Sequence, residues 1–221
     1  MIDLGCGDGE LTMRVARAAG VVEVQGVEFI PHVAEIARGR GVSVAQVDLA
    51  DPLPFATGDY DVVLCNQVIE HVHATDHLLR EISRLLSPSG YAIVSTNNLA
   101  SWSNVASLVL GWQPPPCHVS DEIVLGSPAS FAEGDPGFPG QNHLRIFTGH
   151  ALVELAQHHG LEVDQELSVG YYPAPPRLAA VLVKLDRRHG AFLTHRYTKR
   201  GLGSAPDRGL PPVGSRPRSG V

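Results

Sequence analysis

The chain opens on the stretch Ile2-Asp3-Leu4-Gly5-Cys6-Gly7-Asp8-Gly9, in which a short apolar run leads into three alternating glycines. Glycine lets the backbone turn sharply and lets a ligand lie close to the main chain. A helical pattern follows over residues 10–19. A strand, a glycine-rich turn and a helix in this order are typical of the cofactor site of a doubly wound α/β sheet. Glu10 stands where a dinucleotide fingerprint needs its third glycine, which favours a ligand without a pyrophosphate.

Short β-branched runs alternate with helical patterns as far as residue 95, which indicates βαβ units that feed a parallel sheet. The strands expected in this part are 1–4, 21–27, 42–47, 60–65 and 91–95, and the helices are 10–19, 32–38 and 76–86. A loop-rich insertion follows, and regular structure then resumes with a helix at 149–159, a strand at 161–169, a helix at 177–185 and a strand at 191–198. We therefore predict a Rossmann-like, doubly wound, seven-stranded, mostly parallel sheet.

The domain is expected to span residues 1–200, with the insertion after the fifth strand at 99–142. Residues 201–221 are rich in Gly, Pro, Ser and Arg, a composition that predicts a disordered tail. Because Met1 already lies in the first strand, we also expect the domain to be truncated at its N-terminus, without the segment that would cover one side of the cofactor cleft.

The charge of the chain is unevenly distributed. Residues 1–186 carry 9 Lys and Arg against 22 Asp and Glu, whereas residues 187–221 carry 8 against 1. An acidic body repels phosphate backbones, so no nucleic-acid partner is expected. The three cysteines, Cys6, Cys65 and Cys117, are too few and scattered for a disulfide framework, which favours the cytoplasm. No apolar stretch is long enough to form a transmembrane segment.

Acidic residues follow the next two strands. Glu28 lies 19 positions after Gly9, where a carboxylate can accept hydrogen bonds from both hydroxyls of a ribose. Asp48 follows the third strand, where a carboxylate can accept a hydrogen bond from an adenine amino group. Each feature alone is weak evidence, but their order at successive strand ends predicts a nucleoside-type cofactor.

Four blocks of the sequence carry a family resemblance: IDLGCGDG (2–9), GVE (26–28), VDLADPLPF with YDVVLCNQVIEHV (47–72), and LLSPSGYAIVSTNN (85–98). In these blocks the chain resembles the class I S-adenosylmethionine-dependent methyltransferases, in the broad group that includes the ubiquinone and menaquinone biosynthesis methyltransferases. The resemblance implies S-adenosyl-L-methionine as the cofactor. The contacts it implies are Asp3, Gly5, Gly7 and Gly9 around the methionine and ribose, Glu28 at the ribose, Asp48 and Leu49 at the adenine, and Asn66 beside the fourth strand, with Cys6, Phe29 and Gln67 lining the same cleft.

Methyl transfer from a sulfonium needs in-line alignment of the acceptor and, for a hydroxyl acceptor, removal of its proton. The candidate general bases are His71, after the fourth strand, and His143, at the end of the insertion. Alternatively, His71 packs at the cleft wall and His143 is a loop residue without a catalytic role. No metal site is predicted, because the histidines and acids of this region match no compact ligand pattern: His118, Asp121, His143 and His150.

The acceptor is expected to be a small molecule, and a lipid-like or glycan-linked compound is one alternative. The fourth strand ends in Cys65-Asn66-Gln67-Val68 and lacks the Asn/Asp-Pro-Pro-aromatic motif that holds a flipped base. Long irregular segments are often functional, so residues 99–142 are expected to form an acceptor lid, or else an ordinary surface excursion. The aromatic residues available to such a lid are Trp102, Trp112, Phe131 and Phe138.

Two other functions stay open. A nicotinamide-dependent oxidoreductase is disfavoured by Glu10 and by the absence of a Tyr-x-x-x-Lys pair. A non-catalytic cofactor-binding protein is compatible with an N-terminal truncation. The apolar helix at 177–185 is expected to pack on the sheet rather than to lie on a membrane surface.

Overall fold

A computed structural model describes residues 1–120, 123, 125–126 and 143–201 of the chain. Its central sheet has seven strands in the order β3-β2-β1-β4-β5-β7-β6. Their bounds are β1 Ile2–Leu4, β2 Gln25–Val27, β3 Ser43–Ala45, β4 Tyr60–Asn66, β5 Leu86–Asn97, β6 Leu161–Val169 and β7 Phe192–Lys199. The strands β1 to β5 are parallel to one another, and β7 is antiparallel to both β5 and β6. This confirms the predicted fold class.

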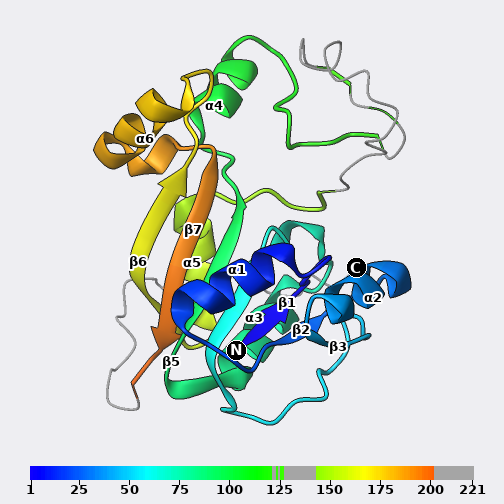
Figure 1. The fold of residues 1–221 in the computed structure, drawn as a ribbon. Coiled ribbons are helices and arrows are strands. Elements are labelled where there is room, and N and C mark those ends of the chain that lie inside the picture. Colours follow the sequence, from blue (N-terminus) through cyan, green and yellow to red (C-terminus); the bar gives the residue numbers. More distant parts are fainter. Residues whose placement is uncertain (121–122, 124, 127–142, 202–221) are drawn as a thin grey trace, which may run out of the picture.

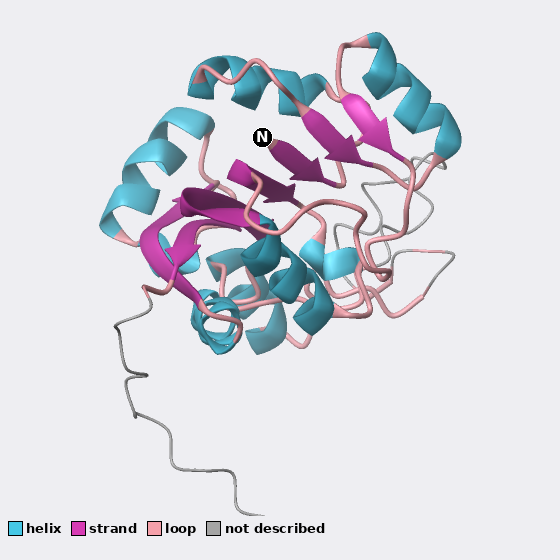
Figure 2. Ribbon diagram, turned by 90° about the horizontal axis from the view of Figure 1, so that it is seen from below, coloured by secondary structure: helices cyan, strands magenta, loops and turns pink. Residues whose placement is uncertain are grey.

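Helices cover both faces of the sheet (Figure 1, Figure 2). The helices are α1 Glu10–Ala19, α2 Pro31–Gly39, α3 Thr75–Leu85, α4 Trp102–Val109, α5 Gly149–His158 and α6 Pro176–Leu185, with short 3-10 turns η1 Ile69–His71 and η3 Arg187–His189. Two separate clusters of buried side chains form the core. One contains residues of α3 and α5, and the other contains residues of α1 and α2. The strand order reverses between β1 and β4, and ligands of open α/β sheets bind at the carboxyl ends of the strands at such a point.

Some predicted boundaries were wrong. β2 begins at Gln25 rather than at residue 21, and the side chain of Val22, an apolar residue of the expected strand, is almost fully exposed. β5 begins at Leu86 rather than at 91, because Leu86 pairs with Tyr60 before the register shifts. The Ser-Pro-Ser-Gly sequence that ends α3 is therefore part of an irregular strand.

The expected irregular segment 99–142 begins with a helix. Ser101 caps α4, since its side chain accepts a hydrogen bond from the N–H of Asn104. The Trp102 indole N–H donates to the Asp186 carboxylate at 2.9 Å, so α4 contacts the end of α6. Most of the remaining insertion, with Phe131 and Phe138, lies outside the described residues, as do residues 202–221 of the expected tail.

The expectation that the apolar helix at 177–185 packs on the sheet was wrong for most of its side chains. Only Ala179 of α6 is buried, whereas Leu178 is 49%, Val181 53% and Leu185 80% exposed. Apolar side chains of α4 are exposed as well, among them Leu108 and Val109. No helix in the described part of the chain is long and apolar enough to cross a membrane.

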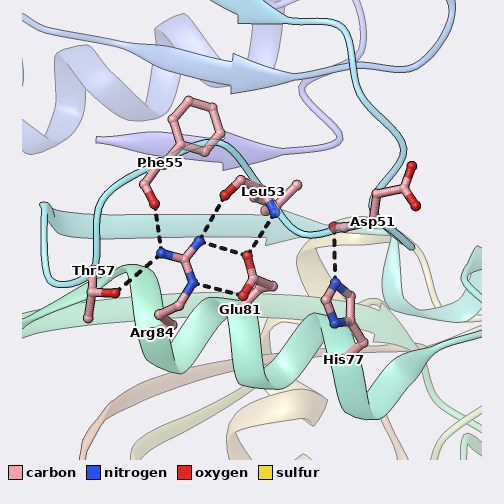
Figure 3. Close-up of polar contacts among 7 residues, drawn as sticks. All are labelled: Asp51, Leu53, Phe55, Thr57, His77, Glu81 and Arg84. Carbon is pink, nitrogen blue, oxygen red and sulfur yellow. Dashed lines mark hydrogen bonds and ion pairs between the residues drawn. The ribbon is translucent and has the colours of Figure 1, made fainter.

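An ion pair on α3 holds the loop between β3 and β4 (Figure 3). The Arg84 guanidinium donates to both carboxylate oxygens of Glu81 at 2.8 Å, and also to the carbonyls of Leu53 and Phe55. Glu81 in turn accepts a hydrogen bond from the N–H of Leu53 at 3.0 Å. His77 contacts the Asp51 carbonyl at 3.0 Å. The loop that begins near Asp48 is therefore fixed to α3 at several main-chain atoms.

Candidate cofactor and acceptor site

The glycine-rich turn follows β1 and is held against β2. The N–H groups of Gly5 and Cys6 both donate to the carbonyl of Val27 at 2.9 Å. Gly5 has a φ of 84°, and a Cβ atom there would lie 2.5 Å from the Val68 side chain. Gly7 has a φ of 54°, and a Cβ there would meet no described atom within 4 Å. The turn therefore requires glycine at position 5 for close packing, whereas at position 7 its main chain borders open space.

Glu28 lies directly after β2 and faces this turn. One carboxylate oxygen accepts a hydrogen bond from the N–H of Gly7 at 3.1 Å, and the other accepts from the N–H of Ile30 at 2.8 Å. The neighbouring Phe29 is 64% exposed. The carboxylate is thus oriented at the glycine turn by two main-chain donors, as a ribose-binding group would need to be.

Asp3, on β1, is almost completely buried. One carboxylate oxygen accepts a hydrogen bond from the Thr12 hydroxyl at 2.6 Å, and the other has no partner among the described residues. Burial raises the pKa of Asp3 from the ordinary value of 3.8 to about 6, although the Thr12 hydrogen bond opposes the rise. An unpartnered buried carboxylate oxygen beneath the glycine turn is a candidate contact for a polar ligand.

Three further residues that were expected to contact the cofactor, Cys6, Asp48 and Leu49, differ in their burial. Cys6 is buried, and its sulfur packs where a Cβ on Gly26 would lie, so its main chain rather than its thiol borders the turn. Asp48 lies three positions after the last residue of β3, is exposed, and accepts a hydrogen bond from the N–H of Ala50 at 2.8 Å. Leu49 is partly buried and packs against the core.

The end of β4 carries two polar residues. Asn66 accepts a hydrogen bond from the Ser95 hydroxyl at 2.6 Å, which links the ends of β4 and β5. Gln67 follows with a φ of 54°, a conformation that is strained for any residue other than glycine and that clusters at functional sites. In the amide orientation that satisfies all its neighbours, the Gln67 side chain donates to a Glu70 carboxylate oxygen at 3.1 Å.

The two predicted general bases lie together beyond β4. The ring centroids of His71 and His143 are 4.8 Å apart, although 71 positions separate the two residues along the chain. The Nδ1 of His143 contacts the Pro116 carbonyl at 3.0 Å, so this nitrogen carries the hydrogen and Nε2 carries the lone pair. Asn97 Nδ2 lies 3.4 Å from that Nε2. Burial lowers the pKa of His143, which favours the neutral ring.

Glu70 completes this group and was not among the predicted site residues. Its carboxylate is fully buried and accepts hydrogen bonds from the Thr96 hydroxyl at 2.9 Å and from Asn97 Nδ2 at 3.4 Å. Its main-chain carbonyl accepts from the N–H of Leu144 at 2.8 Å, which holds His143 against η1. The sequence contains a signal for this residue, an acid directly before His71 in a turn of otherwise apolar residues, but no pairing with position 143 can be read from it.

Comparison with known proteins identifies the family of this chain. A family model described as a methyltransferase domain matches residues 1–166, most of the chain. The chain therefore belongs to the class I S-adenosylmethionine-dependent methyltransferases. S-adenosyl-L-methionine is accordingly its cofactor, as the resemblance implied. The nicotinamide-dependent alternative is not favoured.

Curated relatives of this methyltransferase include enzymes with and without a stated acceptor. A ubiquinone biosynthesis O-methyltransferase of Xanthomonas oryzae pv. oryzae is 34% identical over 104 residues, 44% of this chain and 43% of the relative. A probable S-adenosylmethionine-dependent methyltransferase of Mycobacterium tuberculosis is 32% identical over 186 residues, 81% of this chain and 64% of the relative. The chain thus spans less than half the length of the first of these relatives.

Solved structures share the fold of this methyltransferase. A S-adenosylmethionine-dependent methyltransferase of Thermotoga maritima aligns with a TM-score of 0.57 at 22% identity and covers 90% of this chain and 81% of its own. One from Mesorhizobium loti aligns with a TM-score of 0.58 at 18% identity and covers 89% and 88%. At these identities the likeness extends to the fold alone.

Proposed function

We propose that this methyltransferase transfers the methyl group of S-adenosyl-L-methionine to a hydroxyl oxygen of a small-molecule acceptor. The observation that carries the proposal is the convergence of Glu70, His71 and His143 just beyond β4, next to the strand ends where the cofactor is expected. Because ligands of open parallel sheets bind beyond these strand ends, the acceptor and the cofactor meet in one cleft.

The cofactor half of the proposal assigns the carboxyl ends of β1 to β4 to S-adenosyl-L-methionine. The Glu28 carboxylate binds the ribose hydroxyls, and the unpartnered oxygen of Asp3 faces the polar part of the methionine pocket. The contacts proposed around them are those of the glycine turn and of the strand ends: Gly5, Cys6, Gly7, Gly9, Phe29, Asp48, Leu49, Asn66 and Gln67.

The reaction is an in-line displacement. The acceptor oxygen forms a bond to the methyl carbon while the carbon–sulfur bond breaks, and the sulfonium becomes a neutral thioether. The hydroxyl proton moves to Nε2 of His143, the nitrogen that carries the lone pair. Alignment of the oxygen with the methyl group supplies most of the rate acceleration.

Two observations favour a hydroxyl acceptor with apolar character. Several relatives are named as O-methyltransferases of ubiquinone biosynthesis, although their match covers only part of this chain. The segment that follows β5 carries exposed apolar side chains on α4 and at Trp112, which could contact an apolar acceptor. We accordingly assign residues 99–142 to an acceptor lid. Free cysteines are typical of a reducing compartment, which supports the proposal that the enzyme acts in the cytoplasm.

The proposal is tested by methyl transfer from labelled S-adenosyl-L-methionine to a panel of phenols, catechols and long-chain alcohols. His143→Ala should lower the transfer rate by about 100-fold or more, the usual contribution of a general base, with the affinity for S-adenosylhomocysteine unchanged. His150→Ala is the matched control, since His150 is an exposed histidine that pairs with Glu154 on α5. Cofactor binding without transfer to any acceptor would favour the non-catalytic alternative. Equal rates in the two variants would remove His143 from the mechanism.

A further inference from the structure

Three side chains just beyond the carboxyl end of β4 have the composition of a metal site. A carboxylate oxygen of Glu70 and one ring nitrogen each of His71 and His143 all lie within 4.8 Å of one another. Two imidazoles and one carboxylate are a ligand set that proteins use for Zn²⁺ and for other first-row divalent cations with open coordination positions. This set shares only His143 with the one that the sequence analysis rejected, which also contained His118, Asp121 and His150.

The environment of Glu70 lacks a permanent positive charge. Its carboxylate is fully buried, and its partners are all neutral: the Thr96 hydroxyl and the side-chain amides of Asn97 and Gln67. No Lys or Arg forms an ion pair with it in the described part of the chain. Buried carboxylates are costly unless they are paired with a cation or bind a metal. A divalent cation would compensate this buried charge.

The orientation of His143 also fits a ligand. Metal-binding histidines usually donate their second ring N–H to a carbonyl or carboxylate, which fixes the ring. His143 donates from Nδ1 to the Pro116 carbonyl, and this leaves the Nε2 lone pair, which lies 3.4 Å from the Asn97 amide nitrogen, available to a cation. The Asn97 contacts to both groups are 3.4 Å long, so they are weak and a cation could replace them.

We propose that Glu70, His71 and His143 bind one divalent first-row transition-metal cation at the acceptor end of the cleft. Ligand atoms about 2.1 Å from a tetrahedral cation lie about 3.4 Å apart, so atoms that lie within 4.8 Å of one another have to move closer together by side-chain rotation when the cation binds. His71 is exposed, which leaves that side of the cation open to water or to an acceptor oxygen.

The catalytic consequence rests on the proposed function. An acceptor hydroxyl bound to the cation loses its proton to solvent at a lower pH than the free hydroxyl does. The oxygen then attacks the methyl carbon as before, and the carbon–sulfur bond breaks. In the metal-loaded enzyme His143 would therefore be a ligand and not the base, and water would accept the proton that the cation-bound hydroxyl loses.

Metal binding is tested on the untagged full chain after dialysis against a chelator. Titration with Co²⁺ should saturate at one tight equivalent and produce visible absorption, and Zn²⁺ should displace it. Glu70→Gln and His143→Ala should each weaken Co²⁺ binding by about 100-fold or more, whereas His150→Ala should not change it. Circular dichroism and S-adenosylhomocysteine affinity identify variants that remain folded.

The outcomes separate the two proposals. A folded His143→Ala and a folded Glu70→Gln that both bind Co²⁺ as tightly as the unmodified chain would overturn the metal site. Methyl transfer that persists after chelation would overturn its catalytic role and would leave the histidine base in place. One tight equivalent of Co²⁺, lost in both variants, without methyl transfer to any acceptor would support the site and contradict the proposed function.

Discussion

The Glu28 carboxylate accepts a hydrogen bond from the main-chain N–H of Gly7 at 3.1 Å, which joins the end of β2 to the turn after β1. The N–H of Ile30 holds the other oxygen at 2.8 Å. These donors fix the carboxylate beside the glycine turn before a ligand arrives. A preorganised carboxylate loses little conformational entropy when it binds hydroxyl groups.

Removal of the Glu28 carboxylate should weaken cofactor binding. Glu28→Ala is expected to weaken the binding of S-adenosylhomocysteine by about 1–3 kcal/mol, the scale of a lost hydrogen bond to a charged group. Isothermal titration calorimetry measures the change. Glu35→Ala, on the exposed surface of α2, is the control and should leave the affinity unchanged. Equal affinities in both variants would contradict the ribose assignment.

A side chain at Gly7 should block the cofactor more than it disturbs the fold. A Cβ at this position meets open space, so the Val side chain of Gly7→Val would occupy the space that we assign to the cofactor. Its φ of 54° adds a strain of about 1–2 kcal/mol. Gly58→Val is a matched control, with a φ of 75° and open space around its Cβ, but in the loop before β4. Ultraviolet crosslinking to labelled S-adenosylmethionine should fail for the Gly7 variant only, and labelling of both variants would place the cofactor elsewhere.

The buried Asp3 should make stability depend on acidity. Because burial raises its pKa to about 6, the cofactor-free folded chain binds this proton more tightly than the unfolded chain, whose value is 3.8. The stabilisation is therefore complete below about pH 4 and is lost as the pH rises to about 6, a change of about 3 kcal/mol. The neutral Asp3→Asn variant should lack this change. Urea denaturation of both chains from pH 4 to 7 measures it, and parallel profiles would show that Asp3 ionises normally.

The ion pair in Figure 3 should stabilise the fold more than an exposed pair does. The side chains of Arg84 and Glu81 are 29% and 10% exposed, and Arg84 also binds two loop carbonyls. Arg84→Met should lower the free energy of unfolding by about 2–4 kcal/mol, because it leaves the mostly buried Glu81 without its partner. Arg38→Met removes the partner of Glu35, which is 72% exposed, and should cost less than about 1 kcal/mol. Chemical denaturation compares the two, and similar losses would show that the Arg84 pair behaves as a surface pair.

Local patterns in the sequence were sufficient for the fold class and for the long elements. α3 and β6 were predicted almost to the residue, because helical periodicity and alternation are local properties of the chain. The residues at which β2 and β5 begin were predicted wrongly, because they depend on pairing with strands that are distant in the sequence, and the local periodicity carries no information about that pairing. The apolar pattern of α6 predicted a buried face, but burial also requires a partner surface, and among the side chains of this helix Ala179 alone is fully buried in the described structure.

The sequence by itself determined the glycine turn, the position of Glu28 directly after the second strand, and the family. Each of these depends on residues that are close together in a short motif. Only the tertiary structure decided that His143 lies against Glu70 and His71. That contact depends on main-chain hydrogen bonds from Leu144 to Glu70 and from Leu99 to Phe147, which bring the end of the insertion back to the sheet. Because the two segments are far apart along the chain, no local sequence pattern specifies this contact. The contact forms only when the packed strands hold both segments at one edge of the sheet.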